Sequence, residues 1–225
     1  LYPENIHRKF INFKIGNSFF QDETYDDAQI WLDKLSASDL DTTYREEYYF
    51  KLGYAALQNE DPEAAINAFR ENLKGHSQYA PPSKYFFAHL CFERGSYQLA
   101  LEQFIALEKN TSYCGIVPYY IVQIYHKQGD FDAVIDYAPT VLSCKLVNHE
   151  KDVNHIIGNA HYKKRNYQDA LSYLIKYAKK SRLRREDAYQ IGYAFFQTKS
   201  DFEIQFQTCM CLFFSFWKLF LLACK

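Results

Sequence analysis

The chain has 225 residues, of which 48% are apolar and 24% are charged, and its formal net charge is −1. This composition is ordinary for a globular protein and excludes a disordered chain. The near-zero net charge gives no overall attraction to nucleic acid or to an anionic membrane, so any recognition by charge must be local.

A repeated pattern organises most of the chain. An apolar residue followed by a small or β-branched one recurs at steps of 34 to 37 residues, at Ile15-Gly16, Leu52-Gly53, Phe87-Ala88, Ile121-Val122, Ile157-Gly158 and Ile191-Gly192. Twelve residues after the small position of the first five pairs stand Ala28, Ala65, Ala100, Val134 and Ala170. A constant offset of this kind predicts a repeat architecture.

Each repeat is expected to form two short amphipathic helices joined by a turn, because apolar residues follow helical spacing on both sides of segments such as Gln128-Gly129-Asp130. In chain order, the predicted units lie near residues 10–37, 46–76, 81–111, 115–145, 151–181 and 185–199, the last with its first helix only. One helix pair cannot bury its apolar faces alone, so the units must stack. The prediction is an all-α solenoid over residues 1–199.

Three stretches resemble the tetratricopeptide repeat (TPR) family: Leu52-Gly53-Tyr54-Ala55, Gly95-Ser96-Tyr97-Gln98-Leu99-Ala100-Leu101 and Gly129-Asp130-Phe131. The resemblance covers residues 10–199 and implies a right-handed superhelix of antiparallel helix pairs. The irregular steps and the abundance of Tyr are also similar to the long TPR arrays of bacterial cell-envelope proteins. That second resemblance implies a periplasmic or envelope location.

The TPR resemblance implies a partner-binding groove lined by the first helix of each unit, at positions three before, one after and four after the small residue. The expected groove residues are Phe13, Asn17, Phe20, Phe50, Tyr54, Tyr85, His89, Phe92, Tyr119, Gln123, His126, His155, Asn159, Tyr162, Tyr189 and Tyr193. Rings offer contact area at low entropy cost, and amides can pair with a peptide backbone. The competing interpretation is that the rings pack against the neighbouring unit.

Charge is distributed unevenly along the chain. Residues 21–63 contain twelve acidic residues against three basic ones, and residues 163–185 contain nine basic residues against Asp169. Both runs are typical of solvated faces. The alternative for the basic run is an acidic partner or lipid headgroups, and nucleic acid is not expected because no base-stacking module accompanies it.

No pattern of catalytic residues is present in the sequence. The seven His have no metal-ligand spacing, the six Cys form no paired metal or redox frame, and no P-loop, GxSxG or dinucleotide fingerprint occurs. We therefore expect no enzyme, no cofactor, no metal and no small-molecule substrate. The leading hypothesis is a non-catalytic module that binds a protein or peptide in its groove. The alternative is a structural or assembly segment of a longer cell-envelope scaffold.

The repeat pattern stops near Lys199, and residues 200–225 form an atypical, apolar, Cys-rich segment. From Cys209 to Cys224 it would extend about 24 Å as a helix, short of the roughly 30 Å hydrocarbon core, and Lys218 interrupts it. These features disfavour membrane contact through 209–224. The alternatives are a non-native continuation of the chain or a hydrophobic helix docked on the last repeat.

Overall fold

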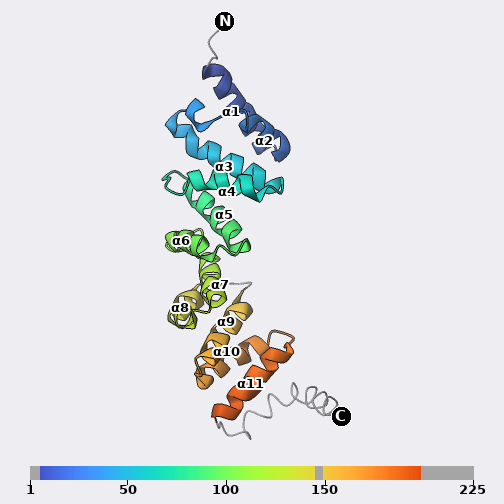
Figure 1. The fold of residues 1–225 in the computed structure, drawn as a ribbon, viewed down its shortest axis with the longest axis vertical. Helices are drawn as coiled ribbons and strands as arrows, with labels where there is room; N and C mark the ends of the chain where they lie inside the picture. Colours follow the sequence, from blue (N-terminus) through green and yellow to red (C-terminus); the bar gives the residue numbers. More distant parts are fainter. Residues whose placement is uncertain (1–5, 145–148, 199–225) are drawn as a thin grey trace. The chain divides into compact units, whose positions relative to one another are not determined.

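The computed structural model describes residues 6–144 and 149–198, and the predicted 200–225 segment lies outside them (Figure 1). The described residues form eleven α-helices and one short 3₁₀ helix, in the following order. They are α1 (Ile6–Gln21), α2 (Tyr25–Leu32), η1 (Ala37–Asp39), α3 (Thr42–Gln58), α4 (Pro62–Glu71), α5 (Ala80–Glu93), α6 (Tyr97–Leu107), α7 (Val117–Gln128), α8 (Phe131–Ser143), α9 (Glu150–Lys163), α10 (Tyr167–Ala178) and α11 (Arg185–Thr198). Among the described helices, none combines the length and the apolar character needed to cross a membrane.

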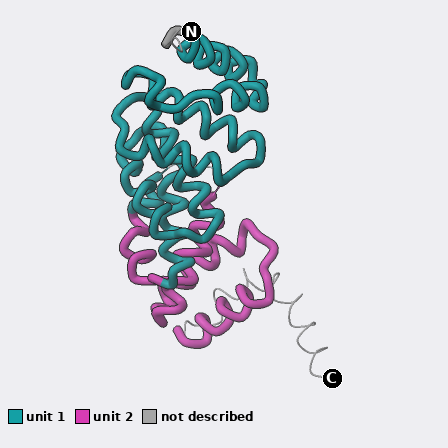
Figure 2. The backbone as a smooth tube through the Cα atoms, turned by 45° about the horizontal axis from the view of Figure 1, so that its top comes forward, with its two compact units in different colours: residues 1–129, 140–147 teal, residues 130–139, 148–225 magenta. Residues whose placement is uncertain are grey.

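The chain divides into two compact units, shown in Figure 2. Unit 1 comprises residues 1–129 and 140–147, and unit 2 comprises residues 130–139 and 148–225. One boundary falls inside α8, directly after Pro139. Proline has no backbone N–H and cannot donate the helical hydrogen bond at its position, so α8 is weakened where the division occurs.

Unit 1 is built from successive helix pairs. Helix α1 packs on α2, α3 on α4 and α5 on α6, and the second helix of each pair also packs on the first helix of the next. The small residues of the repeat make the close packing within a pair possible. A Cβ atom added to Gly53 would come within 2.9 Å of the Phe69 ring, which is fully buried on α4. Ala28, Ala65 and Ala100 are also fully buried.

Unit 2 repeats the same construction in α9, α10 and α11, each packed on the next. A Cβ atom added to Gly158 on α9 would lie 2.7 Å from Leu174 on α10. Leu174, Ala170 and Ala194 are fully buried, and Ile191 joins them in one apolar core. The residue sixteen positions after the glycine therefore fills the space beside it in both units.

The turn inside each pair contains one residue with left-handed backbone geometry, seven positions after the small residue of the first helix. These residues are Glu23, Glu60, Gly95, Gly129 and Arg165, with φ between 58° and 76°. Glycine adopts this geometry without steric cost, whereas a residue with a Cβ does not. Three of the five turns, those with Glu23, Glu60 and Arg165, therefore contain a strained backbone.

Buried polar side chains connect consecutive pairs of unit 1. The side-chain amide of Asn72, after α4, donates to the main-chain oxygen of Glu46 on α3 at 2.8 Å and to the hydroxyl of Ser83 on α5 at 3.0 Å. The carboxylate of Glu46 accepts hydrogen bonds from His76 and Ser77 in the loop between α4 and α5. Burial pushes the pKa of Glu46 upward, but the hydrogen bonds from Ser77 and His76 outweigh it and lower the pKa.

Candidate functional site

Aromatic rings from α1, α2 and α3 form a cluster in unit 1. Phe20 at the end of α1, Tyr25 at the start of α2 and Tyr54 on α3 form a triangle, with all three centroid distances at 5.6 Å. The rings meet at angles of 64° to 76°, an edge-to-face geometry that aromatic pairs prefer. All three side chains are half-buried, so one side of each remains open to solvent.

A hollow of about 430 Å³ opens at this triangle. It is lined by Phe20, Gln21, Glu23, Tyr25, Phe50, Lys51 and Tyr54, from the end of α1, the first turn, the start of α2 and the middle of α3. We call it the α1–α3 pocket. Its volume lies within the range of about 300–1,000 Å³ that small-ligand sites occupy.

A polar network lies beside the α1–α3 pocket. Lys51, only 7% exposed, donates from Nζ to Glu47 Oε1 at 2.6 Å, and Nζ lies 5.5 Å from the centroid of Phe20. Asn17 donates from Nδ2 to the same carboxylate oxygen at 3.1 Å. Asn17 Oδ1 is buried and has no hydrogen-bond partner among the described residues. The charge of Lys51 is therefore neutralised by an internal partner.

The ring contacts continue from the α1–α3 pocket along the first helices of unit 1. Tyr54 contacts Phe86 on α5 at 5.4 Å, and Phe86 contacts Tyr85 at 5.5 Å. Tyr85 in turn reaches Tyr120 on α7 at 6.4 Å. These rings all belong to the first helices α3, α5 and α7. We call the surface that they form the series face; its rings are Tyr54, Tyr85, Phe86 and Tyr120.

Tyr120 is the central ring of the series face in α7, and the sequence pattern did not identify it. It stacks on Phe104 at 4.9 Å and 4°, and it also contacts His89 at 5.5 Å and Phe92 at 5.3 Å. Burial raises the pKa of Tyr120 above its ordinary value. Tyr120 and Phe86 both stand two positions before the small residue of their helix, and this recurring offset is the signal that could have located them.

The remaining predicted residues of unit 1 fall into two groups. Phe50, Tyr85, His89, Phe92, Tyr119, Gln123 and His126 are half-buried on first helices, as expected for residues that share a face with solvent. Phe13 is different, because it is fully buried between Leu32, Leu35, Leu40 and Tyr48. We correct its assignment: Phe13 is a core residue and has no surface to offer a partner.

Unit 2 contains an equivalent ring triangle. Tyr162 at the end of α9, Tyr167 at the start of α10 and Tyr193 on α11 have centroid distances of 5.8, 6.1 and 5.7 Å. Tyr189 stacks on Tyr193 at 6.0 Å and is 66% exposed. The predicted residues Tyr162, Tyr189 and Tyr193 thus come together in unit 2, and Tyr167, like Tyr25 in unit 1, joins them although it was not predicted.

His155 and Asn159 of the predicted groove are engaged in contacts inside unit 2. Asn159 on α9 is 8% exposed and donates from Nδ2 to Gln190 on α11 at 3.2 Å; the equivalent Asn17 also donates to the next first helix, but at a different position, Glu47. His155 Nε2 lies 2.9 Å from the carboxylate of Asp187. The buried asparagines therefore link neighbouring first helices through their amide donors.

Asp187 is 1% exposed, and Arg184 and Tyr177 also donate to it, at 3.0 and 3.1 Å. Burial pushes the pKa of Asp187 upward, but the hydrogen bonds and charges of Arg184 and His155, with the hydroxyl of Tyr177, outweigh it and hold the pKa below its usual value. This carboxylate joins α9, α10 and α11. Over the described residues, no group of three or more His, Cys, Asp or Glu side chains is placed to hold a metal ion.

Comparison with known proteins relates this arrangement to several others. A family model described as anaphase-promoting complex, cyclosome, subunit 3 matches residues 21–107. No curated protein matches the chain.

Solved structures share the fold at low sequence identity. MamA of AMB-1 is 17% identical with a TM-score of 0.64, covering 82% of this chain and 98% of its own. MamA from Desulfovibrio magneticus RS-1 is 14% identical with a TM-score of 0.56, covering 69% and 86%. YrrB, described as a TPR protein with an unusual peptide-binding site, is 16% identical with a TM-score of 0.60, covering 81% and 89%. The likeness confirms the expected all-α solenoid of helix pairs.

Proposed function

We propose that the chain, which shares its fold with tetratricopeptide-repeat proteins, is a non-catalytic binding module for a peptide or protein partner. The observation that carries the proposal is the series face of α3, α5 and α7 together with the α1–α3 pocket that continues it. Half-buried rings need little further ordering on binding, so they provide contact area at low entropic cost. The described peptide-binding site of YrrB, a protein of the same fold, supports this class of partner.

Polar groups on the same face suit a peptide. Gln123 on α7 is half-buried, and a glutamine amide can both donate to and accept from a peptide backbone. A peptide laid along the first helices would find apolar ring surface and such amides side by side. This combination of aromatic contact area and a few orienting polar groups is typical of peptide-recognition surfaces.

Selection of random peptides displayed on phage against the immobilised 225-residue chain tests the proposal. The enriched peptides should bind the wild-type chain and lose about tenfold in affinity, roughly 1.4 kcal/mol, in a Tyr54→Leu, Gln123→Ala double variant. The matched control is Ile105→Ala on the second helix α6, where Ile105 is 48% exposed. Thermal unfolding checks that all variants fold.

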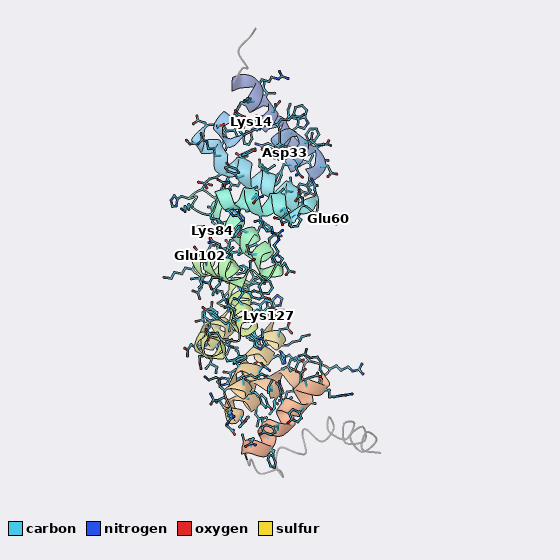
Figure 3. The ribbon with its side chains drawn as sticks, viewed as in Figure 1. Lys14, Asp33, Glu60, Lys84, Glu102 and Lys127 are labelled. Atoms are coloured by element: carbon cyan, nitrogen blue, oxygen red, sulfur yellow. The ribbon has the colours of Figure 1, made fainter. Side chains whose placement is uncertain are left out.

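Two outcomes contradict the proposal. One is that no peptide is enriched on the wild-type chain. The other is that the enriched peptides lose affinity in the Ile105→Ala variant and keep it in the double variant, which would move binding to the second helices. Figure 3 labels Glu102, which lies on α6 with Ile105 and identifies the control helix.

A further inference from the structure

The α1–α3 pocket has walls of a kind that recognises cations. Four rings line it, from Phe20, Tyr25, Phe50 and Tyr54, and the centroids of Phe20 and Phe50 are 6.5 Å apart. The face of an aromatic ring carries partial negative charge, so an ammonium or guanidinium group within about 6 Å of a ring centroid is attracted to it. Several rings around one hollow add their attraction.

In unit 1, a lysine side chain of the chain itself already lies beside one cluster of aromatic rings. The ammonium of Lys14 on α1 lies 5.1 Å from Phe10, 5.7 Å from Phe13 and 5.3 Å from Tyr44. Lys51, at the equivalent position of α3, lies 5.5 Å from Phe20 alone. Tyr25 and Tyr54 face the same hollow without a cation over their rings among the described residues. Figure 3 labels Lys14 on α1.

The charge at the mouth of the pocket favours a positive ligand. Lys51 is neutralised by Glu47 at 2.6 Å, so the polar network contributes no net charge. Glu23 lines the pocket and is exposed, and Asp22 in the same turn and Asp26 and Asp27 at the start of α2 are also exposed. None of these four carboxylates forms an ion pair with a described residue. An incoming cation would therefore meet an excess of negative charge.

Glu23 has left-handed backbone geometry with φ of 58°, as do the equivalent residues Glu60, Gly95, Gly129 and Arg165 of the later turns. A left-handed conformation costs a residue with a Cβ about 1–2 kcal/mol. Burial, followed by the charges of Tyr54 and Glu23, raises the pKa of Tyr25, in agreement with a carboxylate close to the ring triangle.

We propose that the α1–α3 pocket binds a lysine or arginine side chain of the protein partner, which lies against the open sides of the Phe20, Tyr25 and Tyr54 rings and pairs with Glu23 at the mouth. This inference rests on the proposed function and gives the partner's chemistry at one position. An acidic side chain would face Glu23, and the one cation that lines the pocket, Lys51, already has Glu47 as its counter-charge. An apolar side chain would leave the rings' attraction for a cation unused.

Blocked tripeptides of sequence glycine–X–glycine, with X as arginine, lysine, norleucine or glutamate, test the inference on the full 225-residue chain. NMR titration of ¹³C-labelled aromatic side chains gives the dissociation constant of each peptide. The arginine and lysine peptides should shift the Phe20, Tyr25 and Tyr54 signals saturably, at least fivefold more tightly than norleucine. The glutamate peptide should give no saturable shift. Equal binding of norleucine, or preferred binding of glutamate, would overturn the proposal.

Two variants assign the binding to its two parts. Glu23→Gln should weaken the arginine peptide about threefold to fivefold at low salt and reduce its salt dependence, because it removes one ion pair at an exposed mouth. Tyr54→Leu should weaken it about tenfold. Glu102→Gln on α6 is the matched control and should leave binding unchanged. An arginine affinity that is unchanged in both pocket variants would contradict the proposal.

The two proposals can fail separately. If displayed peptides bind the first helices but contain no required basic residue, the pocket assignment is wrong and the proposed function stands. If the tripeptides bind the pocket but no displayed peptide depends on Tyr54 and Gln123, the proposed function is wrong and the pocket chemistry stands.

Sedimentation velocity of the full chain should find no self-association. If the chain instead forms a dimer that dissociates at high salt and is absent in the Glu23→Gln variant, the pocket binds a second copy of the chain. That result would contradict the proposal of a separate protein partner.

Discussion

Left-handed residues at the turns make the stability of single positions predictable. Glu60, labelled in Figure 3, has φ of 59° and is exposed to solvent. Its carboxylate therefore adds little folding free energy to offset the backbone strain. Glu60→Gly should stabilise the protein by about 0.5–1 kcal/mol, because relief of the strain exceeds the added entropy of the unfolded chain. Urea unfolding followed by circular dichroism measures the change.

The matched control for Glu60→Gly is the reverse substitution at the equivalent turn, Gly129→Ala. Gly129 has φ of 75°, and no atom lies within 4 Å of an added Cβ, so the change imposes strain without a clash. It should destabilise the protein by about 1 kcal/mol. Shifts of the same sign in the two variants would contradict the explanation.

His161 predicts acid sensitivity in unit 2. It is 8% exposed, stacks on Tyr173 at 5.6 Å and 4°, and its Nδ1 has no hydrogen-bond partner among the described residues. Burial lowers the pKa of His161 despite the opposing charge of Asp169. The folded state therefore binds fewer protons at this site than the unfolded state, so stability falls as the pH drops through about 6.5.

His161→Phe keeps a ring against Tyr173 and removes the titrating group. The stability of the variant relative to wild type should rise as the pH is lowered from 7.5 to 5.5, by at most about 1.4 kcal/mol per pH unit. Urea midpoints at four pH values in this range measure it, and the values at pH 7.5 serve as the reference. Parallel stability curves for the two proteins would exclude His161 as the source.

Phe13 and Tyr120 show where residue-level prediction from the sequence failed. The family offset places Phe13 in the groove, but Leu35 and Leu40, from the connection between α2 and α3, cover it. The repeat does not encode that connection, so periodicity cannot reveal its contacts. Tyr120 lies next to the predicted Tyr119, and only the packing of α6 against α7 decides which of the two rings turns inward.

At the scale of elements, the repeat pattern predicted the helices well because close packing restricts the residues that fit. The small residue at one position and the larger residue sixteen positions later meet in the structure as Gly53 with Phe69 and Gly158 with Leu174. Contacts outside this pattern were not predicted. The carboxylate of Glu46 holds the loop at His76 and Ser77, about thirty residues away in sequence, and Lys9 contacts Asp39 at the equivalent positions of the first unit, but these polar positions are not part of the apolar pattern.

Gly53→Val tests the close approach of α3 and α4. The new Cβ would lie 2.9 Å from ring carbons of Phe69, and Phe69 is fully buried and cannot move aside without displacing its neighbours. We expect a destabilisation of about 2–3 kcal/mol from overpacking, measured by urea unfolding. Gln98→Val on the exposed face of α6 is the control and should cost below about 1 kcal/mol, since only helix propensity changes. Similar costs at both sites would refute the packing explanation.

At the scale of the whole molecule, the division into two units follows from the nearest-neighbour character of a solenoid. Each repeat contacts only the repeats beside it, so stability is approximately a sum of local terms. The sequence pattern predicted stacked repeats but did not predict the boundary between the two units. One boundary follows Pro139 inside α8, a helix that has the same repeat pattern as the others. A single proline is a weak sequence signal because its effect depends on the helix that contains it.

Local stability has a measurable consequence in hydrogen exchange. Gly158→Val would place a Cβ 2.7 Å from Leu174, so it should loosen α9, α10 and α11 and accelerate amide exchange there about tenfold or more. Exchange in α1–α4 should remain unchanged within error, because the stability of a repeat in a solenoid depends on that repeat and its immediate neighbours. Mass spectrometry of peptic fragments resolves the two regions in one experiment.

The mirror variant Gly16→Val completes this test. Its Cβ would lie 2.9 Å from Leu32, so acceleration should be confined to α1, α2 and α3 and absent from α9–α11. If both variants accelerate exchange equally at the two ends of the chain, the molecule unfolds as one cooperative body and the local picture is wrong. If each acts only near its own site, a substitution in unit 2 can be used to change one binding surface while the α1–α3 pocket keeps its structure.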